Sequence, residues 1–85
     1  MTYEVIVSRR AEKSINKLNA YDRGSIHKIL RALSIDPRPR GAIKLTNQER
    51  YRVKVRHYRV LYKIDDKYLV VTVVEAGHRQ GIYKV

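Results

Sequence analysis

Positively charged and apolar side chains alternate along two consecutive segments, residues 51–56 and 58–64. This period of two is typical of strands that bury one face and expose the other. A two-residue turn at Arg56 and His57 pairs the segments so that Lys54 lies directly opposite Arg59, with Arg52 beside them. The turn lacks the Gly or Asn that tight hairpins favour, so a shifted or bulged pairing is the alternative. Like charges directly opposite each other destabilise a sheet, and a local rule broken in this way indicates a functional site.

The reaction that such a cluster suits is cleavage of a phosphodiester bond in RNA. Guanidinium groups bind phosphate through paired hydrogen bonds. Attack of a 2′-hydroxyl on the adjacent phosphate builds negative charge on the phosphoryl oxygens, and fixed cations aimed at that charge stabilise the transition state. Lys54 is the candidate base for the 2′-hydroxyl proton, because two neighbouring cations disfavour a third positive charge. The simpler alternative is a solvated cationic face whose side chains splay apart.

Three further residues follow the last long strand-like segment and are expected to approach the same face. His78, Arg79 and Tyr83 could each donate a proton or a hydrogen bond there. The alternatives are a turn residue at His78 and a core or edge aromatic at Tyr83. No pair of carboxylates or histidines is spaced for acid–base work, so the general acid stays unassigned. The three histidines lie far apart and lack metal-site spacing, so we predict neither a metal ion nor a cofactor.

The charge balance points to a polyanionic partner. Nineteen Lys and Arg stand against eight Asp and Glu, a formal net charge of +11, and such a field attracts RNA, DNA or an acidic protein. The absence of cysteine excludes a disulfide framework, a cysteine nucleophile and a thiolate metal site. The N-terminal segment lacks the pattern of a signal peptide, and the longest apolar run, Tyr68 to Val74, is too short to span a bilayer. We expect a cytoplasmic protein with no membrane partner.

The elements that must position these residues are expected to form a single α+β domain over residues 1–85. Alternation predicts a first strand from Thr2 to Val7, and helical spacing predicts two helices, capped by Ser8 and by Asp22. The second helix should end in the 36–39 segment, because a residue before proline avoids the helical region. The two helices are expected to form an antiparallel hairpin that covers one face of the sheet.

The rest of the chain is expected to form an antiparallel meander of three to four strands. Residues 41–50 are predicted as a loop, the two alternating segments as strands, and residues 65–66 as a turn. Residues 67–76 are apolar on both faces, which is typical of a central strand, and Gly77 should close it. A short last strand is expected from Ile82 to Val85.

Two stretches of the second half, YRVKVRHYRVLYKIDD and VVTVVEAGHRQGIYKV, resemble the RelE/ParE toxin superfamily and its RelE branch in particular. The most specific motifs are Y-R-V-x-Y and G-H-R-x-x-x-Y, and the resemblance extends to the SRRAEKSINKL and IKL segments. It implies a toxin of a toxin–antitoxin pair that cleaves mRNA in the ribosomal A site. It also implies an acidic, partly disordered antitoxin that wraps the toxin, and operator DNA bound only by the complex of the two.

The resemblance also implies roles for single residues. The strand cations of the family fall on Arg52 and Lys54, the latter as the base-like lysine. The phosphate-stabilising arginines fall on Arg59 and Arg79, and Tyr83 would orient or stack on a base. We further expect three substrate-binding residues: Arg56, His78 and Lys44.

Two other functions remain as alternatives. A ParE-like protein would share the fold but inhibit DNA gyrase by protein contact, and it would have no need of Lys54, Arg59, Arg79 and Tyr83. A nucleic-acid-binding module without catalysis would act with a partner at an operator.

Overall fold

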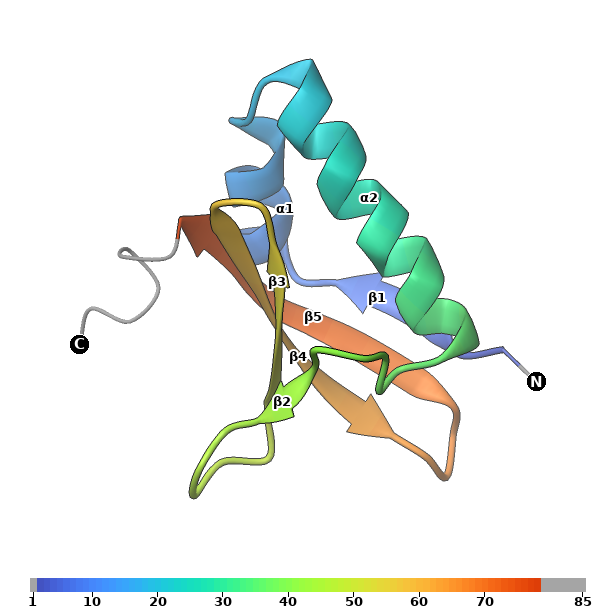
Figure 1. The fold of residues 1–85 in the computed structure, drawn as a ribbon. Coiled ribbons are helices and arrows are strands. Elements are labelled where there is room, and N and C mark those ends of the chain that lie inside the picture. Colours follow the sequence, from blue (N-terminus) through green and yellow to red (C-terminus); the bar gives the residue numbers. More distant parts are fainter. Residues whose placement is uncertain (1, 79–85) are drawn as a thin grey trace.

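The computed structural model describes residues 2–78 of the 85-residue chain. It has the predicted α+β architecture, with a five-stranded sheet in the order β1-β5-β4-β3-β2 and two helices packed on one of its faces (Figure 1). In chain order the elements are β1 (Glu4–Val7), α1 (Arg9–Asn16), α2 (Ala20–Ile35), β2 (Ile43–Lys44), β3 (Tyr51–Val55), β4 (Tyr58–Asp65) and β5 (Val70–His78). Within residues 2–78 no helix is both long and apolar enough to cross a membrane.

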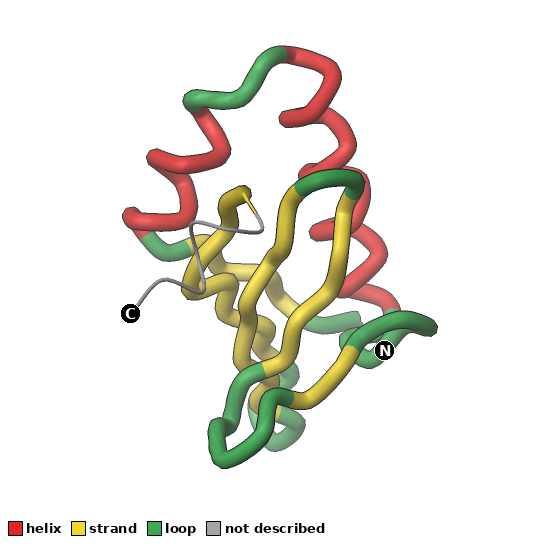
Figure 2. Tube along the Cα trace, turned by 60° about the vertical axis from the view of Figure 1, so that its left-hand side comes forward, coloured by secondary structure: helices red, strands yellow, loops and turns green. Residues whose placement is uncertain are grey.

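The two helices form the expected hairpin, and α2 runs back in the direction opposite to α1 (Figures 1 and 2). Ser8 caps α1 as predicted, because its side chain accepts a hydrogen bond of 3.1 Å from the Ala11 N–H. The predicted cap of α2 is wrong: Asn19 has the extended backbone of a cap, and its side chain accepts from the Asp22 N–H at 2.8 Å. Asp22 lies in the first turn, where its carboxylate still faces the positive end of the helix.

The β3–β4 hairpin has the predicted register, with Lys54 opposite Arg59 and Val53 opposite Val60. β5 lies inside the sheet between β4 and β1, in agreement with its apolar sequence. It begins at Val70 rather than Lys67, and it continues one residue past Gly77. The predicted strand over residues 82–85 lies outside the described residues.

Two features of the sheet were not predicted. β1 is parallel to β5, with Glu4 opposite Val70, and it begins at Glu4 rather than Thr2. β2, within the predicted loop, pairs with the start of β3 as an edge strand. The chain between β1 and β5 contains both helices and strands β2 to β4, and this long connection makes the parallel pairing possible. Alternation within β1 indicates a strand but not its partner or direction.

A β-bulge at β4–β5 decides which side chains of β5 reach the core. Leu61 is opposite Glu75 and Tyr62 is opposite Val73, so Val74 is the extra residue. One extra residue inverts the alternation of a strand. Side chains on both sides of the bulge therefore point into the same core, which is formed by Ala11, Ile15, Ile26, Leu30, Leu33, Val53, Val60, Tyr62, Val71, Val73 and Ala76.

Candidate active site on the open face of the sheet

The face of the sheet that the helices leave uncovered, called the open face, carries a line of cations. Val53, Val60 and Tyr62 are buried on the helix side, so the residues that alternate with them point the other way. The open-face cations are Arg52 and Lys54 of β3 and Arg59 and Lys63 of β4.

Lys54 and Arg59 are register partners at the hairpin end of this group. Lys54 is exposed, whereas Arg59 has only 5% of its surface exposed. The Nε atoms of Arg59 and of its half-buried neighbour Arg52 are also buried. On β5 the partner of Arg59 is Gly77, which has no side chain. An enclosed guanidinium loses little further freedom when it meets an anion, so Arg59 is held in place while Lys54 remains accessible.

Arg56, which we expect to contact substrate, lies against α2 rather than with the open-face cations. Its φ is 57°, a left-handed conformation that costs a non-glycine residue on the order of 1 kcal/mol. Its Nε lies 3.3 Å from Asp22 Oδ1, and its guanidinium carbon lies 4.7 Å from the centroid of the Tyr21 ring. An ion pair and a cation–π contact of this kind each contribute up to about 1 kcal/mol, which offsets the strain. The hairpin therefore keeps its register without Gly or Asn in the turn.

The two other expected substrate-binding residues also do not lie beside the Lys54–Arg59 pair. His78 is opposite Tyr58, and their rings meet edge to face at 5.8 Å, so His78 is on the helix side of β5. Lys44 is opposite Tyr51 on β2, and its Nζ lies 3.6 Å from Glu49 Oε2. The remaining two, Arg79 and Tyr83, lie outside the described residues. The structure thus brings together Arg52, Lys54 and Arg59 of the predicted set.

Arg10 and Lys63 are two cations near this site that the sequence analysis did not single out. Lys63 continues the open face along β4. Arg10 extends from α1 to Glu75, with an N–O distance of 3.2 Å, and Glu75 is opposite Leu61 on the open face. Strand parity could have identified Lys63, but the approach of Arg10 depends on how α1 packs beside β5.

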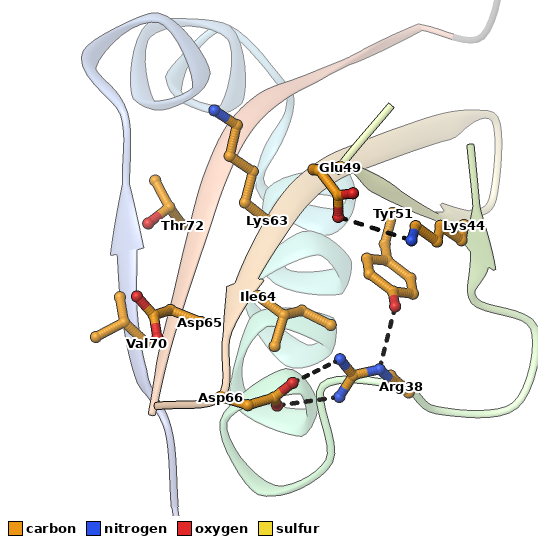
Figure 3. Close-up of a pocket in the computed structure, with 10 residues that line it drawn as sticks. All are labelled: Arg38, Lys44, Glu49, Tyr51, Lys63, Ile64, Asp65, Asp66, Val70 and Thr72. Atoms are coloured by element: carbon orange, nitrogen blue, oxygen red, sulfur yellow. Dashed lines mark hydrogen bonds and ion pairs between the residues drawn. The ribbon is translucent and has the colours of Figure 1, made fainter. Parts of the chain in front are cut away.

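The other end of the sheet holds a polar hollow of about 540 Å³ (Figure 3). Arg38 donates two hydrogen bonds, of 3.2 and 2.9 Å, to the Asp66 carboxylate, and its Nε donates to the Tyr51 hydroxyl at 3.2 Å. Tyr3 also donates to Asp66, at 2.7 Å. The hydrogen bonds from Arg38 and Tyr3 lower the pKa of Asp66, and the bond to Asp66 raises the pKa of Tyr3.

The charges around this hollow balance one another. Three cations and three carboxylates line it: Arg38, Lys44, Lys63, Glu49, Asp65 and Asp66. A balanced set of charges has no net attraction for phosphate, and the Arg38–Asp66 pair joins the segment after α2 to the β4–β5 turn. The hollow is therefore better explained as a structural junction than as a binding site for a polyanion.

The chemistry of the open face is that of an anion site. Fixed guanidinium groups and an ammonium group can hold a phosphate and stabilise negative charge that develops on it. Such a set of cations does not resemble a metal site, whose ligands are neutral or anionic. Among residues 2–78, no group of three or more His, Asp or Glu side chains is placed to hold a metal ion.

Comparison with known proteins gives one family match and several structural matches. Residues 5–83 match the model of the ParE toxin of the type II toxin–antitoxin system parDE. No curated protein matches the sequence.

Several solved structures of RelE toxins match this chain. The RelE–RelB complex of the archaeon Pyrococcus horikoshii matches with a TM-score of 0.84 and 26% identity over 93% of this chain and 97% of that chain. The intact RelBE toxin–antitoxin complex of E. coli matches with a TM-score of 0.78 and 30% identity, over 89% and 95%. The RelBE2 complex of Mycobacterium tuberculosis, with a TM-score of 0.83 and 24% identity over 93% and 100%, shares the fold.

Proposed function

We propose that this chain, which belongs to the RelE/ParE superfamily of toxins of type II toxin–antitoxin systems, is an endoribonuclease that cleaves mRNA on the ribosome. The observation that carries the proposal is the open-face pair of Lys54 and the enclosed Arg59, directly opposite each other and flanked by Arg52. Two like charges held side by side weaken the hairpin, and the benefit that explains them is an anionic substrate.

In the proposed reaction, Arg59 and Arg52 bind the phosphate that will be cleaved. Lys54, in its neutral form, accepts the proton of the neighbouring 2′-hydroxyl, and the 2′-oxygen attacks phosphorus. The bond from phosphorus to the 5′-oxygen breaks, which leaves a 2′,3′-cyclic phosphate and a 5′-hydroxyl once a proton has reached the departing oxygen. Arg79 and Tyr83 complete the proposed site, with Arg79 on the phosphate and Tyr83 on a base. The cations supply the stabilising charge, so the proposal invokes neither a metal ion nor a cofactor.

The proposed partner is an acidic antitoxin. The solved RelE relatives from Pyrococcus horikoshii and E. coli are in complex with RelB antitoxins. A net charge of +11 favours an acidic partner, and such a partner would inhibit the toxin if it covered the open-face cations. Operator DNA would be bound only by the complex. The proposed activity takes place in the cytoplasm, where mRNA is translated.

The match over residues 5–83 to the ParE toxin model favours a second candidate function, inhibition of DNA gyrase. This function needs a surface for protein contact but no cluster of cations around a phosphate. The open-face pair and the structural likeness to RelE toxins favour the nuclease.

One experiment separates the two functions. The purified protein is incubated with ribosomes that carry a 5′-labelled mRNA, and in parallel with gyrase and relaxed plasmid. We expect new mRNA ends that carry a cyclic phosphate, and no effect on supercoiling. Inhibited supercoiling with intact mRNA would overturn the nuclease proposal in favour of the ParE-like function.

A further inference from the structure

Asp22, in the first turn of α2, contacts three side chains, one from the start of α2 and two from the β3–β4 hairpin. Its Oδ2 accepts hydrogen bonds from the Tyr58 hydroxyl at 2.8 Å and from the Asn19 Nδ2 at 3.2 Å. Its Oδ1 lies 3.3 Å from the Arg56 Nε, and the Asp22 side chain is only 13% exposed. The bond to Asn19 is local to the start of α2. The contacts with Arg56 and Tyr58 join α2 to the β3–β4 turn, more than thirty residues later in the chain.

These two contacts hold both sides of the turn that carries the Lys54–Arg59 pair. Arg56 follows Lys54 by two residues and has the strained left-handed backbone of the turn. Tyr58 immediately precedes Arg59 at the start of β4. A rotation of the turn about the strand direction would therefore break one contact or the other. A single carboxylate fixes the twist of the hairpin at the place where the two cations meet.

The contacts of Asp22 are a direct link at a place where a hollow separates part of the hairpin from α2. A hollow of about 430 Å³, with a mostly apolar lining, lies between α2 and the end of β3. Its lining includes Ile29 and Ala32 of α2, and Lys54 and Val55 of β3. Close packing is what normally transmits position from a helix to a strand. Where the packing is open, the contacts of Asp22 supply this restraint.

The same chain of contacts continues to the end of β5. The Tyr58 ring meets the His78 ring edge to face, with the centroids 5.8 Å apart. His78 is the last described residue of β5 and immediately precedes Arg79 in the sequence. Through Tyr58, Asp22 thus restrains both the start of β4 and the end of β5.

We infer that Asp22 is a positioning residue, which through Arg56 and Tyr58 holds the Lys54–Arg59 pair in the geometry needed for catalysis. The inference rests on the proposed nuclease function. It assigns Arg56 to the support of the site rather than to contact with substrate. A small displacement of a catalytic group by a change outside the reacting centre can cost about 10²-fold in rate, so a restraint of this kind is measurable.

The test compares Asp22→Asn and Tyr58→Phe with Ser8→Ala in the full chain. Asp22→Asn keeps the size of the side chain but removes the charge that holds Arg56, and Tyr58→Phe removes only the hydroxyl. Ser8→Ala is the matched control, because it removes the bond from the Ala11 N–H that caps the other helix and the bond of 3.0 Å to the Val74 carbonyl of β5, but no contact of the β3–β4 turn. Each variant is assayed for thermal unfolding, affinity for programmed ribosomes, and the single-turnover rate of mRNA cleavage at saturation.

We expect Asp22→Asn and Tyr58→Phe each to reduce the single-turnover rate by on the order of 10-fold, with little change in affinity. The double variant should lose less than the product of the two effects, because both changes break one restraint. Ser8→Ala should lower the melting temperature and leave the rate unchanged. If all three variants lose rate in proportion to their loss of stability, Asp22 is only a structural residue and the inference is wrong.

A second readout does not depend on cleavage. In a ¹H–¹⁵N NMR spectrum of arginine-labelled protein, the buried Nε–H of Arg59 should exchange slowly with solvent. Asp22→Asn should accelerate that exchange, whereas Ser8→Ala should not. Unchanged exchange in Asp22→Asn would overturn the inference. If the unaltered protein cleaves no RNA, the proposed function fails, and this measurement still decides whether Asp22 positions Arg59.

Discussion

The two ends of the sheet use the same kinds of residue for different purposes. At one end, Arg38, Asp66 and two tyrosines form a network that joins the segment after α2 to the β4–β5 turn. At the other end, Asp22 joins Arg56 and Tyr58, and beyond them lie cations that face the open side of the sheet. The cations of the first end are matched by carboxylates. At the second end, Lys54 and Arg59 carry the same charge and are register partners of each other.

The comparison indicates how to separate structural charges from functional ones in a very basic protein. The chain has 19 Lys and Arg residues and a net charge of +11, so the presence of a Lys or Arg does not by itself identify a functional residue. A cation held against a carboxylate stabilises the fold to a small extent. Register partners of like charge weaken a hairpin, so a function is the reason to keep them, and this favours the hairpin end as the candidate site.

The largest expected effect is on cleavage by Lys54→Ala. If Lys54 acts as the base, its removal should reduce the single-turnover rate of mRNA cleavage by about 10²-fold or more, the scale of general acid–base catalysis. Folding should survive, because the Lys54 side chain is exposed. The measurement is cleavage of ribosome-bound mRNA at saturating protein, alongside thermal unfolding.

Two control variants sharpen this result. Lys13→Ala changes an exposed lysine of α1, and Arg38→Ala changes a cation of the balanced end. Both should keep cleavage within about twofold, since exposed substitutions outside a site have small effects. Equal losses in Lys54→Ala and Arg38→Ala would remove the distinction between the two ends.

The next effect is the dependence of RNA binding on salt. If the four open-face cations each neutralise one phosphate of single-stranded RNA, affinity should fall roughly 50-fold between 50 and 200 mM salt, through counterion release. Arg52→Ala should reduce the slope of log affinity against log salt by about 0.7, whereas Arg38→Ala should leave it unchanged. Titrations of labelled RNA at several salt concentrations give the slope. A flat response would contradict polyanion binding by the open face.

A smaller effect concerns Tyr62, which lies in the core next to the balanced end. Its hydroxyl donates a hydrogen bond of 2.8 Å to the Pro37 carbonyl, and Tyr62→Phe should cost about 1 kcal/mol of unfolding free energy. Burial raises the pKa of Tyr62 to about 12. The neutral form is thus favoured in the folded state, so its stabilising effect is complete below pH 10 and is lost as the pH rises toward about 12.

Denaturation at a series of alkaline pH values tests this assignment. The unaltered protein should lose stability between pH 10 and about 12, and Tyr62→Phe should lose less in that range. Tyr68→Phe is the control, because Tyr68 is 70% exposed and lies outside the core. An identical alkaline profile for the protein and Tyr62→Phe would show that Tyr62 does not titrate in this range.

The smallest expected effect is at Asp66. Hydrogen bonds from Arg38 and Tyr3 lower the pKa of this carboxyl below its ordinary value of 3.8. Asp66 therefore adds stability that is present above that value and is lost as the pH falls through the lower pKa of the folded state. Both side chains of the Arg38–Asp66 pair are substantially exposed, so the contribution is small and screened by salt. Asp66→Asn should flatten the acid limb of the stability profile slightly, and a steeper limb would contradict the assignment.

Much of the fold could be predicted from local patterns in the sequence. The alternation in residues 51–64 predicted the β3–β4 register pair by pair, since a shift of one residue would turn every apolar side chain away from the core. The Ser8 cap and the end of α2 before Pro37 were also predicted, because both depend on residues within one turn of helix. The superfamily followed from the two motifs of the second half. The roles of Lys54, Arg59, Arg79 and Tyr83 stay predictions.

Contacts between residues that are distant in the sequence were decided only by the tertiary structure. The sequence analysis placed the cap of α2 at Asp22, whereas the structure has the cap at Asn19 and holds Asp22 in the first turn, in contact with the hairpin. The parallel pairing of β1 with β5 and the bulge at Val74 depend on partners more than sixty residues away or on the packing of a whole strand. The position of the Arg56 side chain also depends on a distant residue, Asp22. The alternation of the strand predicted that the Arg56 side chain lies among the cations. Because Arg56 is in the turn, the direction of its side chain is instead set by its left-handed backbone and by its contact with Asp22. Periodicity reports which residues are buried together, whereas the direction of a turn residue is decided by contacts that only the folded chain forms.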